Sequence, residues 1–250
     1  MKKMMKQGMF EIISNVELAK HTFEMVLQGD TSAISAPGQF VNIRLAGHFL
    51  RRPISVCDWE GDNLTIIYKV VGKGTEDMSR MEAGEKLDVL TGLGNGYDTA
   101  LSGEFPLLLG GGAGIPPMYA LAKKLIAEKK KIRVILGFNS KNELFYDKKF
   151  VKLGADVKVT TADGSAGMKG FVTDAMDAGY TYTYSCGPEP MLRAVYEKSE
   201  TSGQYSFEER MGCGFGACMG CTCETKYGYK RICRDGPVLV KEEIVWRKQR

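Results

Sequence analysis

The sequence predicts an α+β chain of several domains: an antiparallel β-barrel, an α/β unit with a parallel sheet, and a small cysteine-rich tail. Short alternating strands fill the first 100 residues, apolar strands then alternate with helical segments, and five of the seven cysteines fall between Cys213 and Cys233. A chain of 250 residues, 44% of them hydrophobic, can bury more than one core. We expect domain boundaries at 1–100, 101–203 and 204–250.

The barrel is predicted from short runs in which apolar and polar residues alternate, as they do in half-buried strands. Glycine-rich turns such as Gly61-Asp62 and Gly72-Lys73-Gly74 separate or follow these runs. Several short strands at this spacing favour a small antiparallel barrel. The predicted strands cover residues 10–16, 22–27, 39–45 and 63–70.

The pattern changes at about Pro106, where continuous apolar strands begin to alternate with helical segments. This alternation is typical of a parallel sheet. The predicted strands cover residues 107–109, 132–137, 157–161 and 181–185, and a helix is predicted over 116–129. After about residue 203 few apolar residues follow, so we expect the tail to need a metal to fold.

Charge and termini exclude several classes of protein. The 34 basic and 30 acidic residues give a net charge of +4 that is too small and dispersed to indicate nucleic-acid binding. No apolar region follows the basic start, and no stretch approaches the roughly 20 apolar residues that span a membrane. An odd, clustered set of cysteines does not resemble a disulfide framework. We therefore expect a cytoplasmic protein.

The cysteine spacing is the strongest signal for function. Cys213, Cys218 and Cys221 form C-x4-C-x2-C, and Cys233 follows after eleven more residues. This is the plant-type arrangement for a [2Fe–2S] cluster. A four-cysteine zinc site in a binding module without redox activity is the alternative, although such sites usually pair two C-x2–4-C segments. Cys223 would be left over, or could substitute as a ligand.

Two segments of the predicted barrel suggest a flavin site. Arg52, Pro53, Ile54 and Ser55 combine a cation that can neutralise a pyrophosphate with a hydroxyl that can hydrogen-bond a flavin ring. The loop 72–75 is rich in glycine and could present N–H groups to phosphate oxygens. Read singly, the first segment could be a surface ion pair and the second a hairpin turn.

A nicotinamide site is predicted where the first apolar strand meets the following helix. Gly111, Gly112 and Gly114 lie at this junction and would let a dinucleotide approach the backbone, although a tight turn needs glycines as well. Asp163 could lie near a ribose or within a turn. No catalytic motif accompanies His21 or His48 in the sequence, and both are predicted to be surface or packing residues.

Residues 52–55 resemble the Arg-x-Tyr-Ser flavin motif of the ferredoxin reductase superfamily, with Ile54 where many members carry an aromatic residue. Together with Gly74-Thr75, the cysteine cluster and the closing segment 233–237, the whole chain resembles the electron-transfer subunits of the dihydroorotate dehydrogenase B family. The resemblance implies FAD contacts at residues 52–55, Ile67, Tyr68, Lys69, Gly74 and Thr75. It also implies cluster ligands at Cys213, Cys218, Cys221 and Cys233, and a nicotinamide beside Cys186, Gly187 and Pro188. A buried structural cysteine is the alternative for Cys186.

The resemblance implies an oxidoreductase subunit without catalytic residues for a small organic substrate. NAD would exchange a hydride with FAD, and FAD would exchange single electrons with the [2Fe–2S] cluster. The implied partner is an FMN-containing catalytic subunit that oxidises dihydroorotate in pyrimidine biosynthesis, in a heterotetramer of two plus two chains. The alternative is a related NAD(P)H-linked electron-transfer flavoprotein for ferredoxin, sulfide or hydrogenase chemistry; the resemblance favours NAD over NADP.

Overall fold

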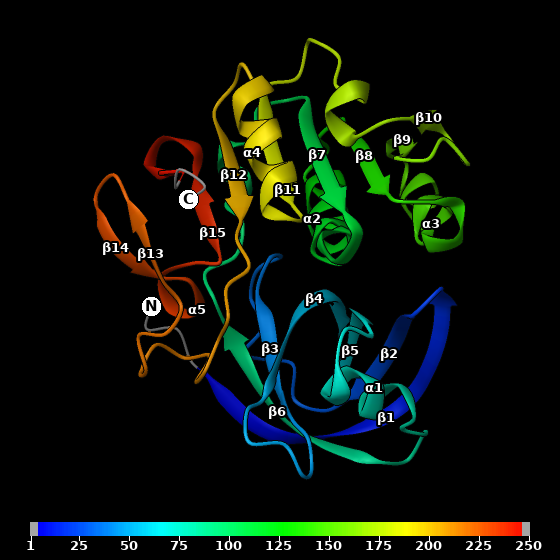
Figure 1. The fold of residues 1–250 in the computed structure, drawn as a ribbon, viewed down its shortest axis with the longest axis vertical. Helices are drawn as coiled ribbons and strands as arrows, with labels where there is room; N and C mark the ends of the chain where they lie inside the picture. Colours follow the sequence, from blue (N-terminus) through cyan, green and yellow to red (C-terminus); the bar gives the residue numbers. More distant parts are fainter. Residues whose placement is uncertain (1–4, 247–250) are drawn as a thin grey trace.

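The computed structural model describes residues 5–246, which form a barrel, an extended sheet with helices, and a hairpin at the C-terminal side (Figure 1). The barrel closes in the order β1-β2-β5-β4-β3-β6, with every neighbouring pair antiparallel. Its strands are β1 Lys6–Ala19, β2 Thr22–Gln28, β3 Phe40–Arg44, β4 Arg52–Glu60, β5 Asn63–Lys69 and β6 Lys86–Leu93. The four predicted strands are confirmed, and β4 and β6 complete the barrel.

The glycine-rich segment after β5 is a helix start and not the predicted loop. Helix α1 covers Lys73–Ser79, with Gly72 as its N-cap. The Thr75 hydroxyl accepts a hydrogen bond from the Val71 N–H at 3.0 Å and donates to the Gly72 carbonyl at 3.0 Å. This local bonding turns the chain directly from the strand into the helix.

The second sheet has the order β10-β9-β8-β7-β11-β12-β15. Its pairs are parallel except β12 with β15. The strands are β7 Pro106–Gly111, β8 Arg133–Phe138, β9 Asp156–Thr161, β10 Met168–Lys169, β11 Tyr182–Cys186, β12 Gly203–Ser206 and β15 Val238–Val240. The predicted parallel sheet is therefore confirmed.

Helices cover both faces of this sheet, which explains why its strands are apolar on both sides. Leu108 packs into the same core as Leu121 and Leu125 of α2, whereas Leu107 packs into the core that holds Leu192 of α4. The helices are α2 Ile115–Ala127, α3 Asp147–Leu153 and α4 Glu189–Lys198. Short 3₁₀ segments lie at Thr99–Leu101, Gly112–Gly114, Lys141–Glu143, Val172–Ala175 and Lys241–Glu243.

The tail is attached to the second sheet by packing as well as by its cysteines. A hairpin of β13 Thr222–Thr225 and β14 Gly228–Arg231 leads into the short helix α5 Ile232–Asp235. Strands β12 and β15 extend the sheet, and Ile232, Leu239 and Ile244 are buried in the core that also holds Leu107. Apolar packing against the sheet therefore helps to stabilise the tail, in addition to the metal that the sequence led us to expect.

The barrel and the second sheet share one interface. Cys57 of β4 and Ile67 of β5 lie in the same apolar core as helix α2. Among the described residues, three ion pairs cross the interface: Asp58 with Lys123 at 2.6 Å, Glu24 with Lys149 at 2.8 Å, and Lys69 with Glu143 at 3.1 Å. Apolar burial supplies most of the adhesion, and the ion pairs fix the relative orientation.

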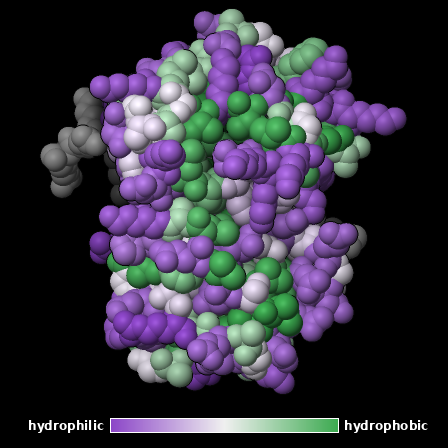
Figure 2. Space-filling model, turned by 90° about the vertical axis from the view of Figure 1, so that its right-hand side faces the viewer, coloured by the Kyte–Doolittle hydropathy of each residue, from purple (hydrophilic) through white to green (hydrophobic). Residues whose placement is uncertain are grey.

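The outer surface on the side of Figure 2 is mainly hydrophilic, with hydrophobic residues in interrupted groups (Figure 2). Within residues 5–246, no helix is both long and apolar enough to cross a membrane.

Candidate functional site

A cavity of about 910 Å³ lies where the barrel, the second sheet and the tail meet. It brings together most of the cofactor residues predicted from the sequence. Those that line it are Arg52, Pro53, Ile54, Ser55, Ile67, Tyr68, Lys69, Thr75, Gly111, Gly114, Cys186, Gly187 and Pro188. Gly112 lines a smaller neighbouring cavity instead, and Gly74 lines neither.

Two adjacent arginines form the cationic end of the barrel wall, but their charges are used differently. Arg51 is ion-paired with Asp88 at 2.9 Å, and it also donates to the Asp88 carbonyl. Arg52 donates to neutral acceptors, the Leu50 carbonyl and the His48 ring. The guanidinium of Arg52 therefore keeps its charge available for an anionic group in the cavity.

Gly74 contributes to the site by making room for Arg52. A Cβ atom at Gly74 would lie 2.1 Å from Arg52 Nε, so the guanidinium can lie against the start of α1 only because this residue is glycine. The role predicted for Gly74 is direct contact with phosphate. The structure adds a second role, because Gly74 determines where the cation lies.

The Gly74→Ala variant is expected to bind FAD about tenfold more weakly, because the methyl group displaces a charged hydrogen-bonding group. The measurement is a fluorescence titration of the flavin-free chain with FAD. Gly72→Ala is the matched control, since nothing lies within 4 Å of a Cβ there and the Gly72 φ of −178° is open to any residue. Equal affinities in the two variants would contradict this role for Gly74.

The barrel also supplies an apolar wall. Ile54 and Ile67 line the cavity beside Tyr68, whose hydroxyl donates to Asn15 Oδ1 at 2.9 Å. Burial raises the pKa of Tyr68 to about 12, so the phenol remains protonated at neutral pH. Apolar side chains next to a cation suit a ligand with a flat ring at one end and phosphates at the other.

The opposite wall is built where β7 and β11 lie side by side. A Cβ at Gly114 would lie 2.1 Å from the Cys186 carbonyl oxygen, and one at Gly111 would lie 2.5 Å from Met191 Sδ. The two predicted nicotinamide segments, 111–114 and 186–188, therefore approach each other closely because the glycines carry no side chains. Crevices at the carboxyl ends of such strands are the usual place for dinucleotides.

Cys186 lies at the end of β11 and lines the cavity. Burial raises the pKa of its thiol to about 12, although the Ser206 hydroxyl opposes the shift. Tyr97, from the segment after the barrel, donates to the neighbouring Ser185 carbonyl at 3.1 Å. Cys186 is thus a buried, neutral thiol at the edge of an apolar core, and not a reactive thiolate.

Asp163 lies outside the large cavity and within a turn. Its carboxylate accepts hydrogen bonds from the Ser165 N–H at 2.9 Å and the Ser165 hydroxyl at 2.6 Å. These bonds lower the pKa of Asp163. Of the two interpretations open from sequence, the structure shows the turn.

Hydrogen bonds from backbone N–H groups to sulfur link the four predicted cluster cysteines in two pairs. The Cys218 N–H donates to Cys213 Sγ, and the Cys233 N–H donates to Cys221 Sγ. The β13–β14 hairpin returns Cys233 to the loop. Each iron of a [2Fe–2S] cluster takes two protein ligands, so two pairs match its donor set. Within the described residues, no three or more His, Cys, Asp or Glu side chains form a group that could hold a single metal ion.

Backbone N–H groups of the loop point at the cysteine sulfurs. Cys213 Sγ accepts from the N–H of Ala217 at 3.2 Å and of Cys218 at 3.4 Å, and Cys221 Sγ accepts from the Cys233 N–H at 3.4 Å. Burial opposes ionisation of Cys213, but these backbone hydrogen bonds outweigh it and lower its pKa to about 6. At Cys213 the loop therefore stabilises thiolate, the form that binds iron. At Cys233 the shift is opposite, because burial and the neighbouring Cys221 raise the pKa of its thiol to about 12.

The cysteine loop is fixed to the barrel. Asn42 of β3 donates to the Cys213 carbonyl at 3.1 Å. Gly214 has a φ of +80°, and a Cβ there would lie 2.3 Å from Asn42 Nδ2. Only glycine allows both this backbone conformation and this approach.

Residues just before the cysteine loop line the cavity, and the sequence analysis did not identify them as cavity residues. They are Phe207, Glu208, Glu209, Arg210 and Met211. Trp246, from the far end of the described chain, lines it too. Proximity to Cys213 was a usable signal for residues 207–211, whereas no motif marks Trp246.

The residues present fit the cofactors expected from the sequence. The cavity joins a cationic end, an apolar wall and a glycine-rich crevice, as a flavin next to a nicotinamide requires. Met211, which lines the cavity, lies two residues before Cys213. This combination defines an iron–sulfur oxidoreductase with the ferredoxin reductase type of fold.

Comparisons with known proteins identify the family. A model described as the iron–sulfur cluster binding domain of dihydroorotate dehydrogenase B matches residues 208–245, and an oxidoreductase NAD-binding domain matches residues 108–197. The electron transfer subunits of dihydroorotate dehydrogenase B (NAD(+)) from Bacillus mycoides (strain KBAB4) and Bacillus cereus (strain G9842) are each 43% identical, over 97% of this chain and 99% of theirs. The chain belongs to the family of dihydroorotate dehydrogenase B electron transfer subunits.

Solved structures share the fold of this chain. An NADH-dependent reduced ferredoxin–NADP oxidoreductase, studied for flavin-based electron bifurcation, is 32% identical and superposes with a TM-score of 0.87, covering 96% of this chain and 90% of that one. A ferredoxin NADP+ reductase from Neisseria gonorrhoeae with bound FAD and NADP shares the fold at 16% identity, with a TM-score of 0.65, covering 77% of this chain and 90% of that one. The predicted family, an iron–sulfur domain and an NAD-binding domain are confirmed.

Proposed function

We propose that this chain passes electrons from an FMN-containing catalytic subunit, through [2Fe–2S] and FAD, to NAD+ in a cytoplasmic dihydroorotate dehydrogenase of pyrimidine biosynthesis. The observation that carries the proposal is the single cavity wall that runs from Arg52 past Cys186 to Met211, two residues before Cys213. Flavin, nicotinamide and cluster sites would therefore be adjacent, and electron transfer would need no large movement of the chain.

The residues would divide the work by their chemistry. Arg52 and Thr75 would face the flavin phosphates, while Pro53, Ile54 and Ser55 would lie along the ring with Ile67, Tyr68 and Lys69. Gly111, Gly112 and Gly114 would receive the dinucleotide, and Cys186, Gly187 and Pro188 would exclude water beside the nicotinamide. When bound, FAD supplies the exchange between a two-electron hydride and the single electrons that the cluster carries.

The four cysteines would hold the cluster, and the tail would present it to the catalytic subunit. Cys218 is exposed, and two loop side chains beside it, Phe215 and Met219, are 46% and 55% exposed. On the adjoining hairpin, Tyr227 and Tyr229 are 77% and 75% exposed. Aromatic and methionine side chains are enriched in interfaces, so we assign this surface to the catalytic subunit, in an assembly of two plus two chains.

Domain boundaries near residues 100 and 203 are part of this proposal, with one qualification from the sheet. Strand β12 begins at Gly203 and pairs with β11, so the first strand of the proposed cluster domain completes the nucleotide-binding sheet. The cluster domain and this sheet would therefore move as one body.

Copurification tests the function. The chain is purified together with the proteins that copurify with it, and the preparation is analysed for flavin, iron and the identity of those proteins. An FMN subunit with dihydroorotate-dependent reduction of NAD+ supports the proposal, and a hydrogenase or glutamate-synthase-like partner contradicts it. A colourless, zinc-containing protein would favour the binding-module alternative.

A further inference from the structure

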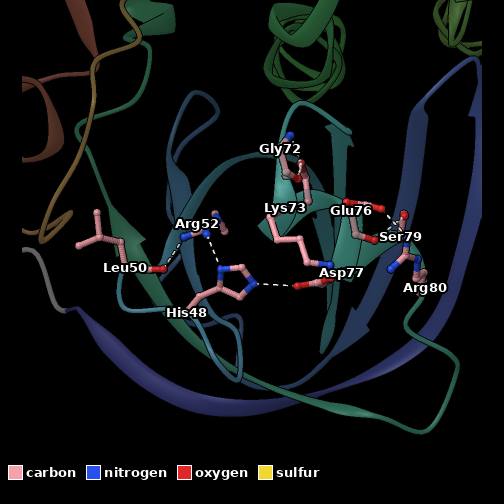
Figure 3. Close-up of polar contacts among 10 residues, drawn as sticks. His48, Leu50, Arg52, Gly72, Lys73, Glu76, Asp77, Ser79 and Arg80 are labelled. Atoms are coloured by element: carbon pink, nitrogen blue, oxygen red, sulfur yellow. Dashed lines mark hydrogen bonds and ion pairs between the residues drawn. The ribbon is translucent and has the colours of Figure 1, made fainter.

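His48 joins the two barrel segments that are predicted to bind the flavin phosphates. It lies in the loop between β3 and β4, and its side chain is 15% exposed. Its Nδ1 lies 2.8 Å from an Arg52 guanidinium nitrogen, and its Nε2 lies 2.8 Å from Asp77 Oδ2 of helix α1 (Figure 3). The sequence predicted a surface or packing residue, but the structure places this ring against a cavity residue.

The partners of His48 determine where its proton lies. A guanidinium can only donate hydrogen bonds, so Nδ1 must be the acceptor and Nε2 must carry the hydrogen. Nε2 then donates to Asp77, whose other oxygen accepts from Lys73 Nζ at 2.7 Å. Hydrogen bonds from Lys73 and then from His48 lower the pKa of Asp77, which keeps it an anion. The result is a chain from Lys73 through Asp77 and His48 to Arg52.

We propose that His48, as a neutral ring, is a positioning residue that holds the Arg52 guanidinium toward the flavin pyrophosphate. The inference rests on the proposed function, because that function assigns Arg52 to the phosphates. The other hydrogen-bond partner of Arg52 is the Leu50 carbonyl, which lies in the same loop. Of its two partners, only His48 ties the guanidinium to helix α1, where Thr75 lines the cavity.

The experiment is a fluorescence titration of the flavin-free, full-length chain with FAD. We expect His48→Leu to weaken FAD binding about tenfold, because it removes a hydrogen bond to a charged group. His48→Asn places an amide oxygen near the position of Nδ1. We expect it to stay within about threefold of the unsubstituted chain, because the amide oxygen can accept the Arg52 hydrogen bond in place of Nδ1.

A double-mutant cycle separates positioning from general stability. In an Arg52→Ala background, His48→Leu should have no further effect on FAD affinity, because His48 acts through Arg52. Thermal unfolding of the flavin-free variants reports any folding defect. If His48→Leu does not fold, the same cycle is measured with His48→Ala, which also removes the acceptor for Arg52.

Three results would overturn the inference: unchanged affinity in His48→Leu, a loss in His48→Asn as large as that in His48→Leu, or an additive effect in the Arg52→Ala background. Each of these leaves the proposed function intact, because FAD still binds. Failure of the unsubstituted chain to bind FAD would overturn the proposed function, and the inference with it.

Discussion

Cys218→Ser is expected to remove the [2Fe–2S] cluster while FAD remains bound. Cys218 is exposed at the surface of the tail, so a serine of similar size should not disturb the core. Changes to the surroundings of a metal ligand alone cost about 10–100-fold in affinity, so loss of the ligand itself should lower cluster occupancy at least about tenfold. Iron content and visible absorbance measure the cluster, and flavin released on denaturation measures FAD.

Cys223→Ser is the matched control for this substitution. Cys223 lies on β13, two residues beyond the last cysteine of the loop, and it lines the large cavity. A full complement of iron in Cys223→Ser with loss in Cys218→Ser supports the proposed ligands. Iron retained in Cys218→Ser and lost in Cys223→Ser would instead show that Cys223 is a ligand.

Gly114→Ala is expected to have the largest effect on the nicotinamide side. Its Cβ would meet three backbone atoms, the carbonyl oxygen and carbon of Cys186 at 2.1 and 2.3 Å and the Gly187 nitrogen at 2.6 Å. Backbone cannot rotate away as a side chain can, so the start of α2 must move from the end of β11. We expect a stability loss of about 1–3 kcal/mol and a roughly hundredfold slower reduction of bound flavin by NADH.

Gly112→Ala is the control that separates steric overlap of a Cβ at residue 114 from backbone strain. Gly112 has a φ of +51° with nothing within 4 Å of a Cβ, whereas Gly114 has an ordinary φ of −83°. Strain alone costs about 1–2 kcal/mol, so Gly112→Ala should lose stability but reduce flavin within about tenfold of the normal rate. Stopped-flow absorbance measures the rate. A normal rate in Gly114→Ala would contradict the placement of the nicotinamide.

Periodic strands and fixed cysteine spacings could be predicted from the sequence because they depend on residues that are close together along the chain. Alternating strands such as 22–27 and the apolar strand at Leu107–Leu109 indicate how they are buried, and C-x4-C-x2-C predicts a ligand set that stays a prediction. Strand β4 was harder to predict because Arg52, Pro53 and Ser55, which face the cavity, interrupt its apolar pattern. The predicted loop at 72–75 was wrong because the Thr75 hydroxyl closes the turn into a helix.

The sequence by itself determined the order of the three units, the four cysteines and the residue types of the flavin and nicotinamide segments, since each depends on neighbours along the chain. Tertiary structure alone decided which of these residues share a cavity, how Asn42 fixes the cysteine loop to the barrel, and that His48 contacts Arg52. These contacts join residues that no periodicity links. Their geometry exists only after the barrel has closed and the second sheet has packed against it.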